Sequence, residues 1–276
     1  MRYIIPIFIL FQFLFLTACE FSKKQGEKET VQGETNVPDS VQYTTQLIRK
    51  MDNLCDDSLR ECSYVQIKYP EVTGGLSETV RDELNGFIKD QILDMIGAGD
   101  TVKTLQGAIH VFIADYQDFK SKMPETFQTW IQEIDIRVLK NDTDIFSMAM
   151  ANDSYLGGAH PNYQLHYVNF NVKTGHKLGL EDIIAEREQL NTIAEVKFRK
   201  LKNIDQDQNL SDADFLFEND KFAVNDNFAI TNDKLIFYFN DYEIASYAQG
   251  PTSLEIPLSE ISHLLKNEFK ADQPIN

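Results

Sequence analysis

The sequence predicts an α+β fold of two packed subdomains, with mainly antiparallel sheets flanked by helices. Two observations predict it. Alternating strand patterns and amphipathic helix patterns both occur along the chain, but they do not follow the regular βαβ rhythm of a parallel sheet. Beyond the N-terminal segment about 230 residues remain, which is enough for one large domain or two small ones. We place an N-terminal module at residues 43–151 and a C-terminal module at residues 152–276.

The N-terminal segment carries the signs of export. The stretch "MRYIIPIFILFQFLFLTAC" has Arg2, then an apolar run, then small residues before Cys19. This is the pattern of a secretory signal over residues 1–18, and its apolar run is too short to span a bilayer. Leu-Thr-Ala-Cys also matches a bacterial lipobox, which predicts that Cys19 is lipidated. An ordinary signal peptide with a chance cysteine is the alternative.

A polar segment follows and predicts a flexible tether over residues 19–42. It contains many charges and few apolar residues, so it cannot bury enough surface to fold. Removing residues 1–18 takes away one base and no acid, which moves the formal charge from −17 to −18. Such a field repels nucleic acid and favours basic partners. A solvated acidic surface of no special meaning remains the alternative.

Cys55 and Cys62 are the cysteines that remain after Cys19. Outside the cytoplasm such a pair predicts a disulfide that closes a short loop. A metal site is the weaker interpretation, since there are only two thiols and no histidine nearby.

In the N-terminal module we expect a strand that stops at Pro70 and a helix from Ser77, which is a suitable N-cap residue. A second helix is expected from Ile109 onward. Two alternating runs joined at residues 140–143 predict a hairpin.

In the C-terminal module we expect a strand up to residue 172 with a turn at residues 173–175. An amphipathic helix is expected over residues 180–202, and strands over 233–240 and 253–257. The last strand passes into a final helix near Pro257.

The metal candidates have the wrong spacing. Asp205, Asp207 and Asn209 match the first ligand positions of an EF-hand loop, but Leu210 and Leu216 stand where glycine and glutamate are required. His160 and His166 are six residues apart on an extended segment, unlike the helical HExxH site. We therefore expect neither a metal nor a cofactor.

The stretch "SYLGGAHPNYQLHY" at residues 154–167 predicts a tight turn. Gly157 and Gly158 allow positive φ angles, and Pro161 forces His160 into extended geometry. A hydrolase built on His160 would need an oriented nucleophile, and Ser154 lacks the elbow motif of serine hydrolases. We therefore expect a structural turn in a protein that is not an enzyme.

Polar-tipped aromatic residues surround this turn, and such residues suit a protein-binding surface. The candidate binding residues are Tyr155, His160, Asn162, Tyr163, Tyr242 and Glu243.

Three motifs in order carry a resemblance to known proteins: "GGAHPNY", "VNFNVKTGHKLGLEDI" and "LIFYFNDYEIASYAQGPTSLEIPLSEI". They resemble a C-terminal module of unknown function shared by envelope proteins. These include the ectodomains of lysozyme-sensing anti-sigma factors (RsiV-like) and the non-catalytic half of peptidoglycan deacetylases (PdaC-like). The similarity covers residues 152–265, and residues 60–150 are similar to the companion N-terminal module.

The resemblance implies a two-part α+β fold, and lysozyme is the ligand of the best understood relatives. The sequence departs from them in having a lipobox in place of a spanning helix, and no deacetylase catalytic domain is expected. We therefore expect a lipid-anchored protein of the bacterial cell envelope that binds a basic protein such as lysozyme. Binding of peptidoglycan or another cell-wall glycan, an envelope hydrolase and a purely structural partner of another envelope protein remain alternatives.

Overall fold

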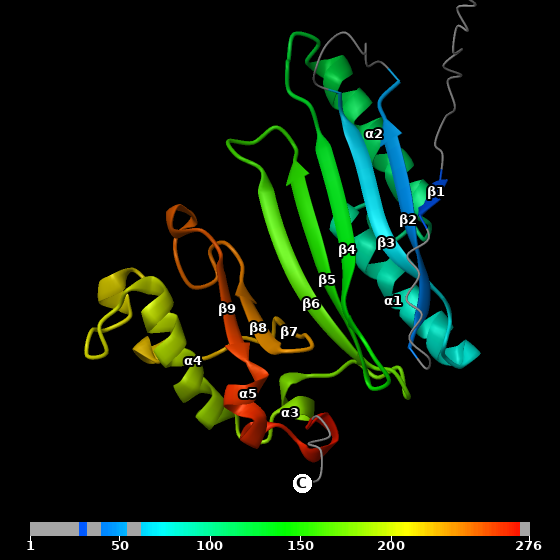
Figure 1. Cartoon of the computed structure of the whole chain (residues 1–276). Helices are drawn as coiled ribbons and strands as arrows, with labels where there is room; N and C mark the ends of the chain where they lie inside the picture. The colour runs from blue at the N-terminus through cyan, green and yellow to red at the C-terminus, as the bar shows by residue number, and fades with distance from the viewer. Residues whose placement is uncertain (1–27, 32–39, 54–61, 271–276) are drawn as a thin grey trace, which may run out of the picture.

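The computed structural model describes residues 28–31, 40–53 and 62–270. These residues form two packed parts, a long six-stranded sheet with two helices and a smaller part built on three strands (Figure 1). The predicted signal peptide, Cys19 and Cys55 lie outside the described residues. Lipidation and the Cys55–Cys62 disulfide therefore stay predictions.

The large sheet has the strand order β1-β2-β3-β4-β5-β6. All neighbours are antiparallel except β3 and β4, which are parallel because a long helical connection joins them. The strands are β1 (Lys28–Val31), β2 (Gln42–Met51), β3 (Tyr64–Gly74), β4 (Ile131–Asn141), β5 (Ile145–Tyr155) and β6 (Asn162–Asn171).

The connection between β3 and β4 consists of α1 (Glu78–Ile96) and α2 (Leu105–Lys122), which cover one face of the sheet (Figure 1). Ser77 caps α1 as predicted, since its Oγ accepts a hydrogen bond from the Val80 N–H at 3.4 Å. The apolar residues of α1 and α2 pack together against the apolar side chains on one face of β3 to β6. This core positions the strands. No helix of the described part of the chain covers the opposite face of the sheet, which we call the helix-free face.

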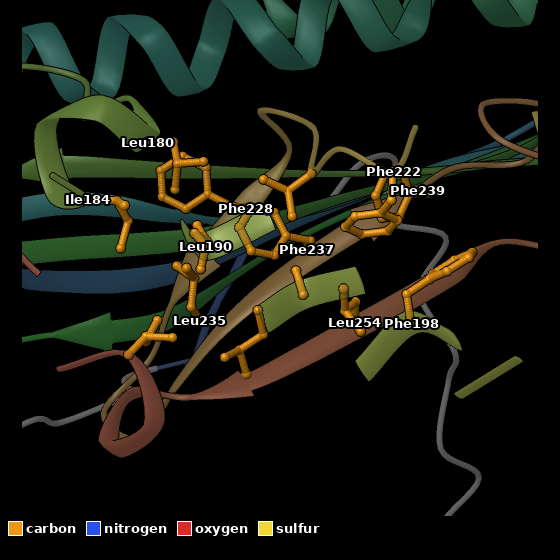
Figure 2. Packing of buried hydrophobic residues seen from close by; sticks show 14 of the residues in the cluster. Leu180, Ile184, Leu190, Phe198, Phe222, Phe228, Leu235, Phe237, Phe239 and Leu254 are labelled. Carbon is orange, nitrogen blue, oxygen red and sulfur yellow. The ribbon is translucent and has the colours of Figure 1, made fainter. Parts of the chain in front are cut away.

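The smaller part contains the three-stranded antiparallel sheet β7-β8-β9. Its core is rich in phenylalanine and includes Phe198, Phe222, Phe228, Phe237 and Phe239 (Figure 2). The Phe198 ring packs edge-on against Phe215, and its centroid lies 5.1 Å from that of Phe222. The elements are α3 (Leu180–Ile183), α4 (Arg187–Lys202), β7 (Phe228–Ile230), β8 (Lys234–Phe239), β9 (Thr252–Pro257) and α5 (Leu258–Ile261). Short 3₁₀ turns cover Ser211–Ala213, Glu218–Asp220, Tyr247–Gln249, Ser262–Leu264 and Asn267–Phe269.

Asparagine side chains join the two parts along the outer edge of β6. Asn240 accepts from the Leu165 N–H at 2.8 Å and donates to the Leu165 carbonyl at 3.1 Å. Asn227 accepts from the Tyr167 N–H at 2.7 Å and donates to the Leu165 carbonyl at 2.8 Å. Asn169 of β6 in turn donates to the Phe228 carbonyl at 2.8 Å. These amides satisfy backbone groups at a sheet edge that would otherwise be unpaired.

The α+β class with two subdomains is confirmed, but the predicted boundary between residues 151 and 152 is wrong. It falls inside β5, and β6 belongs to the first sheet. The change of sheet comes after Val172, where the chain leaves β6 through the predicted turn, with Gly175 at φ 71°. The alternation of apolar and polar residues predicts the strand β6, but it does not predict which sheet the strand joins.

Two further expectations need correction. Residues 28–31 of the predicted tether form β1, because a short polar strand can pair with the edge of β2 without burying a core. Pro70 does not end its strand, since β3 continues to Gly74. Among the residues that the structure describes, β3 pairs beyond Lys68 with β2 alone, so the missing N–H of Pro70 is tolerated there.

Candidate functional site

Three loops meet at one end of the molecule, which we call the loop end. It comprises the α2–β4 loop (residues 123–130) and the β5–β6 loop (156–161), at the upper end of the large sheet in Figure 1, and the β8–β9 loop (240–251), at the upper end of the smaller part. The Gln128 side chain donates to the Gly157 carbonyl at 2.9 Å, which joins the first two loops. His160 stacks on Tyr247, which joins the second and third.

The β5–β6 loop holds the GGAHP turn. Gly157 has φ 87°, and a Cβ there would lie 2.8 Å from the Gln128 side-chain oxygen, so the position requires glycine. Gly158 does not have a positive φ, contrary to expectation, because one left-handed residue suffices to reverse the chain. His160 is exposed, and its Nδ1 lies 2.8 Å from the Pro161 carbonyl oxygen.

An aromatic ladder of His160, Tyr247 and Tyr242 crosses from the first part of the molecule to the second. The ring centroids of His160 and Tyr247 are 4.1 Å apart with planes 19° from parallel. Those of Tyr247 and Tyr242 are 5.6 Å apart at 25°. Tyr242 is 66% exposed at the end of the ladder, so a flat aromatic face is presented to solvent.

Tyr242 stands in an unusual backbone conformation, with φ 66°. A bulky residue in this left-handed region is an outlier, and such strain is concentrated at functional sites. Glu243 holds the turn: its carboxylate accepts from the Asn240 N–H at 2.8 Å and from the Asn225 side chain at 2.7 Å. The Glu243 carboxylate therefore supports the turn that presents Tyr242.

An apolar patch lies beside the ladder on the α2–β4 and β5–β6 loops. Phe127 is 93% exposed, Met123 55% and Leu156 54%. Tyr155 joins Met123 and Phe127 in lining a shallow hollow of about 490 Å³. Contiguous exposed apolar groups of this kind mark interaction sites on soluble domains.

Acidic groups lie on the helix-free face of the sheet where the strands reach the loop end. Glu133 and Asp153 are directly opposite each other on β4 and β5, and Tyr163 is the partner of Asp153 on β6. Burial, together with Glu133, raises the pKa of the Asp153 carboxyl. The Tyr64 hydroxyl donates to Glu133, and burial with that hydrogen bond raises the pKa of Tyr64 to about 12. Like charges opposite one another on a sheet destabilise it, so this arrangement favours a cationic ligand.

The candidate residues from the sequence fall into three groups. Tyr242 and His160 belong to the ladder, and Tyr155 lines the apolar hollow. Tyr163 lies on the acidic face beside Asp153, whereas the exposed Asn162 starts β6 on the opposite face. Glu243 is engaged within its turn.

Four residues of the site were not predicted from the sequence as binding residues: Phe127, Tyr247, Glu133 and Asp153. The two carboxylates are 20 residues apart in the chain, and only the β4–β5 register brings them together. Phe127 lies in a loop without any motif, and its exposure is the only sign of a role.

The loop that contains Asp205, Asp207 and Asn209, whose spacing does not fit an EF-hand, is held by the side chain of Arg199. The Arg199 guanidinium donates to the carbonyls of Asp205 at 2.9 Å and Gln208 at 2.8 Å. Within the described ranges, no group of three His, Cys, Asp or Glu side chains is placed to hold a metal ion. No helix among the described residues is long and apolar enough to cross a membrane.

Two family models match separate stretches of the chain. Residues 57–163 match a model described as deacetylase PdaC, and residues 181–259 match one described as a protein of unknown function, DUF3298. These matches support the resemblance to PdaC-like and DUF3298 proteins. The resemblance to anti-sigma-factor ectodomains stays a prediction. A search among curated proteins gives no match.

Two solved structures share the fold. A DUF3298 family member from Bacteroides fragilis NCTC 9343 gives a TM-score of 0.63 at 20% identity, covering 89% of this chain and 96% of that one. A DUF3298 family protein from Pseudomonas aeruginosa PAO1 gives 0.59 at 15% identity, covering 84% of this chain and 98% of that one. At these identities the likeness concerns the fold alone.

Proposed function

We propose that this chain is a lipid-anchored protein of the bacterial cell envelope that binds a basic protein at its loop end, without catalysis. A muramidase such as lysozyme is the most concrete ligand, because the sequence motifs resemble those of lysozyme-sensing ectodomains. The observation that carries the proposal is the gathering of exposed aromatic and apolar side chains on three loops at one end of an acidic molecule.

The composition of the loop end fits a protein ligand. Aromatic residues and methionine are enriched in protein interfaces, and a few such residues supply most of the binding energy. Phe127 and Tyr242 project the largest exposed aromatic surfaces of the loop end. The strained turn at Tyr242 holds its ring in place before the ligand arrives, which reduces the entropy lost on binding.

Electrostatics favour a basic ligand over a neutral one. The chain carries 43 acidic and 26 basic residues, and Glu133 and Asp153 place two carboxylates on the sheet face that leads to the loop end. A field of this kind raises the association rate of a cationic protein, and salt reduces the effect.

Calorimetric titration of residues 20–276 with lysozyme, at low and at physiological salt, tests the proposal. This range keeps β1, which pairs with β2. We expect saturable binding that weakens as salt is added, with no cleavage of the ligand. Absence of heat at both salt concentrations would refute lysozyme as the ligand.

A cell-wall glycan is a second candidate, and the aromatic ladder favours it. Stacked rings with an exposed face can pack against the apolar face of a sugar ring, and such a contact depends little on salt. Titration with peptidoglycan fragments distinguishes the two: salt-independent binding that is lost in Tyr242→Ala would favour the glycan.

A further inference from the structure

The register of β1 shows which end of the large sheet lies nearer to the N-terminal part of the chain. β1 begins at Lys28, which pairs with Ile48, three residues before β2 ends at Met51. Met51 is level with Tyr64, and Tyr64 is level with Ile131, where β4 leaves the loop end. At about 3.3 Å per residue, Lys28 therefore lies about 10 Å from the loop-end side of β2 and about 20 Å from its other side.

The distance from this strand to the lipid is limited by the length of the chain between them. Lys28 follows Cys19, the proposed lipid-bearing residue, by nine residues. A chain of nine residues spans at most about 30 Å, whatever its conformation. The longest strands of the large sheet have 11 residues, which corresponds to about 36 Å. The connection to the membrane is therefore shorter than the sheet that it holds.

Exposed apolar side chains distinguish the two ends of this sheet. Phe127 and Met123 are both exposed on the α2–β4 loop, which forms the upper end of the large sheet in Figure 1 and extends beyond the upper end of the smaller part. In the described part of the chain, no large apolar side chain is exposed in the turns at the opposite end, residues 75–77, 142–144 and 172–179. The end that lies nearer to Lys28 is thus also the end with apolar groups to offer a lipid surface.

The segment before Phe127 is neutral although the protein as a whole is acidic. It contains two bases, Lys120 and Lys122, and two acids, Asp118 and Glu125. The Lys122 ammonium pairs with the Asp118 carboxylate at 2.5 Å. A neutral segment is not repelled by zwitterionic headgroups, and lysine side chains at such a surface keep their amines in the headgroup layer while their stems lie along apolar groups.

We propose that the loop end is turned toward the membrane that carries the lipid, and that Phe127 and Met123 insert into its surface while no ligand is bound. Glu133 and Asp153 lie on β4 and β5 rather than on this loop, so their carboxylates stay in water. Two side chains suffice because the anchor makes the contact intramolecular, at an effective concentration in the millimolar range.

The membrane then regulates the loop end by competing with its ligand. A protein that binds there has to replace the lipid at Phe127, so the anchored chain binds it more weakly than the free chain does. This inference rests on the lipid anchor of the proposed function, but it does not depend on the identity of the ligand.

Tryptophan quenching by brominated phosphatidylcholine measures the contact with lipid. Residues 19–276 are coupled through Cys19 to a maleimide lipid in phosphatidylcholine vesicles, with or without bromine, so the result does not depend on lipidation in the cell. Peptide mapping confirms that Cys19 carries the lipid. The variants Phe127→Trp and Leu216→Trp each add one tryptophan, at an exposed position, to Trp130, the single tryptophan of the sequence.

The two variants form a matched pair, because Leu216 lies in the smaller part. We expect the brominated lipid to quench Phe127→Trp at least about twofold more than the wild type, because an inserted ring lies within reach of the acyl chains. Leu216→Trp should be quenched no more than the wild type. Equal quenching of the two variants, or no quenching of either, would overturn the contact with lipid.

Addition of lysozyme to the same vesicles tests the competition. We expect the quenching of Phe127→Trp to fall as the protein binds, and quenching that stays unchanged when this variant is saturated would overturn the competition. If calorimetry of soluble residues 20–276 shows no binding of lysozyme, the proposed ligand is wrong, whereas the quenching of the matched pair still decides the contact with lipid.

Discussion

At the scale of single residues, Tyr242 carries the clearest sign of function. A tyrosine at positive φ costs stability that glycine or asparagine would not, and here the ring is largely exposed, so burial does not compensate. This loss of stability is expected where a strained backbone positions a side chain for a ligand. Sequence reasoning could select Tyr242 from its aromatic surroundings, but the strain depends on backbone angles that no motif specifies.

Replacing Tyr242 by glycine should therefore stabilise the protein and weaken ligand binding. We expect the free energy of unfolding to rise by about 0.5–1 kcal/mol, because glycine adopts positive φ without steric cost. Urea unfolding and ligand titration measure the two effects. Tyr247 does not have a positive φ, so the matched change Tyr247→Gly should lower the free energy of unfolding. A loss of stability in both variants would contradict the strain argument.

A second residue-scale prediction concerns Asp153. Burial and Glu133 raise its pKa in the folded state, so its carboxyl favours folding while protonated, and that contribution is lost as the pH rises through the folded pKa. Asp153→Asn should raise the melting temperature at pH 7 and have little effect at pH 3, where the aspartate is already protonated. Thermal unfolding at the two pH values measures this, and an equal shift at both would show that charge is not the cause.

At the scale of elements, features set by short stretches of sequence could be predicted, whereas the pairing of strands far apart in the chain could not. The cap at Ser77 and the hairpin of β4 and β5 follow from short stretches of sequence, and both are present. The placement of β6 in the first sheet and the pairing of β1 with β2 depend on partners far along the chain. The role of the asparagines at the edge of β6 could not be predicted either, because it depends on how the second part packs against this strand.

These asparagines give an element-scale prediction. Asn227→Ala would leave the Tyr167 N–H without its acceptor at the junction of the two parts and remove a donor to Leu165. An unsatisfied group of this kind costs about 1–3 kcal/mol, so the free energy of unfolding should fall by that amount. Asn232→Ala changes the same residue type at an exposed turn and should cost less than about 0.5 kcal/mol. Equal losses in urea unfolding would show that Asn227 does not join the two parts.

At the scale of the whole molecule, the most exposed aromatic side chains of the loop end lie outside the hydrophobic cores. One core lies between the helices and the large sheet, another lies within the smaller part, and a small third cluster with Ala149, Leu165 and Tyr238 lies between the two parts. The β8–β9 loop contributes Ile244 and Ala245 to the core of the smaller part, whereas the exposed Phe127 and Tyr242 belong to none of these clusters. The exposed aromatic and apolar side chains of the loop end are therefore available for the proposed ligand, and the acidic charge of the chain would favour a basic one.

The most direct test of this account compares two truncations of exposed apolar side chains in lysozyme titrations. Phe127→Ser alters the loop end, and Leu216→Ser alters the smaller part in the segment between α4 and β7, where Leu216 is 71% exposed. We predict that Phe127→Ser weakens binding about tenfold or more, as expected for an aromatic residue at the centre of an interface, while Leu216→Ser binds as the wild type does. Equal affinities for both variants and the wild type would contradict the claim that the loop end is the binding surface.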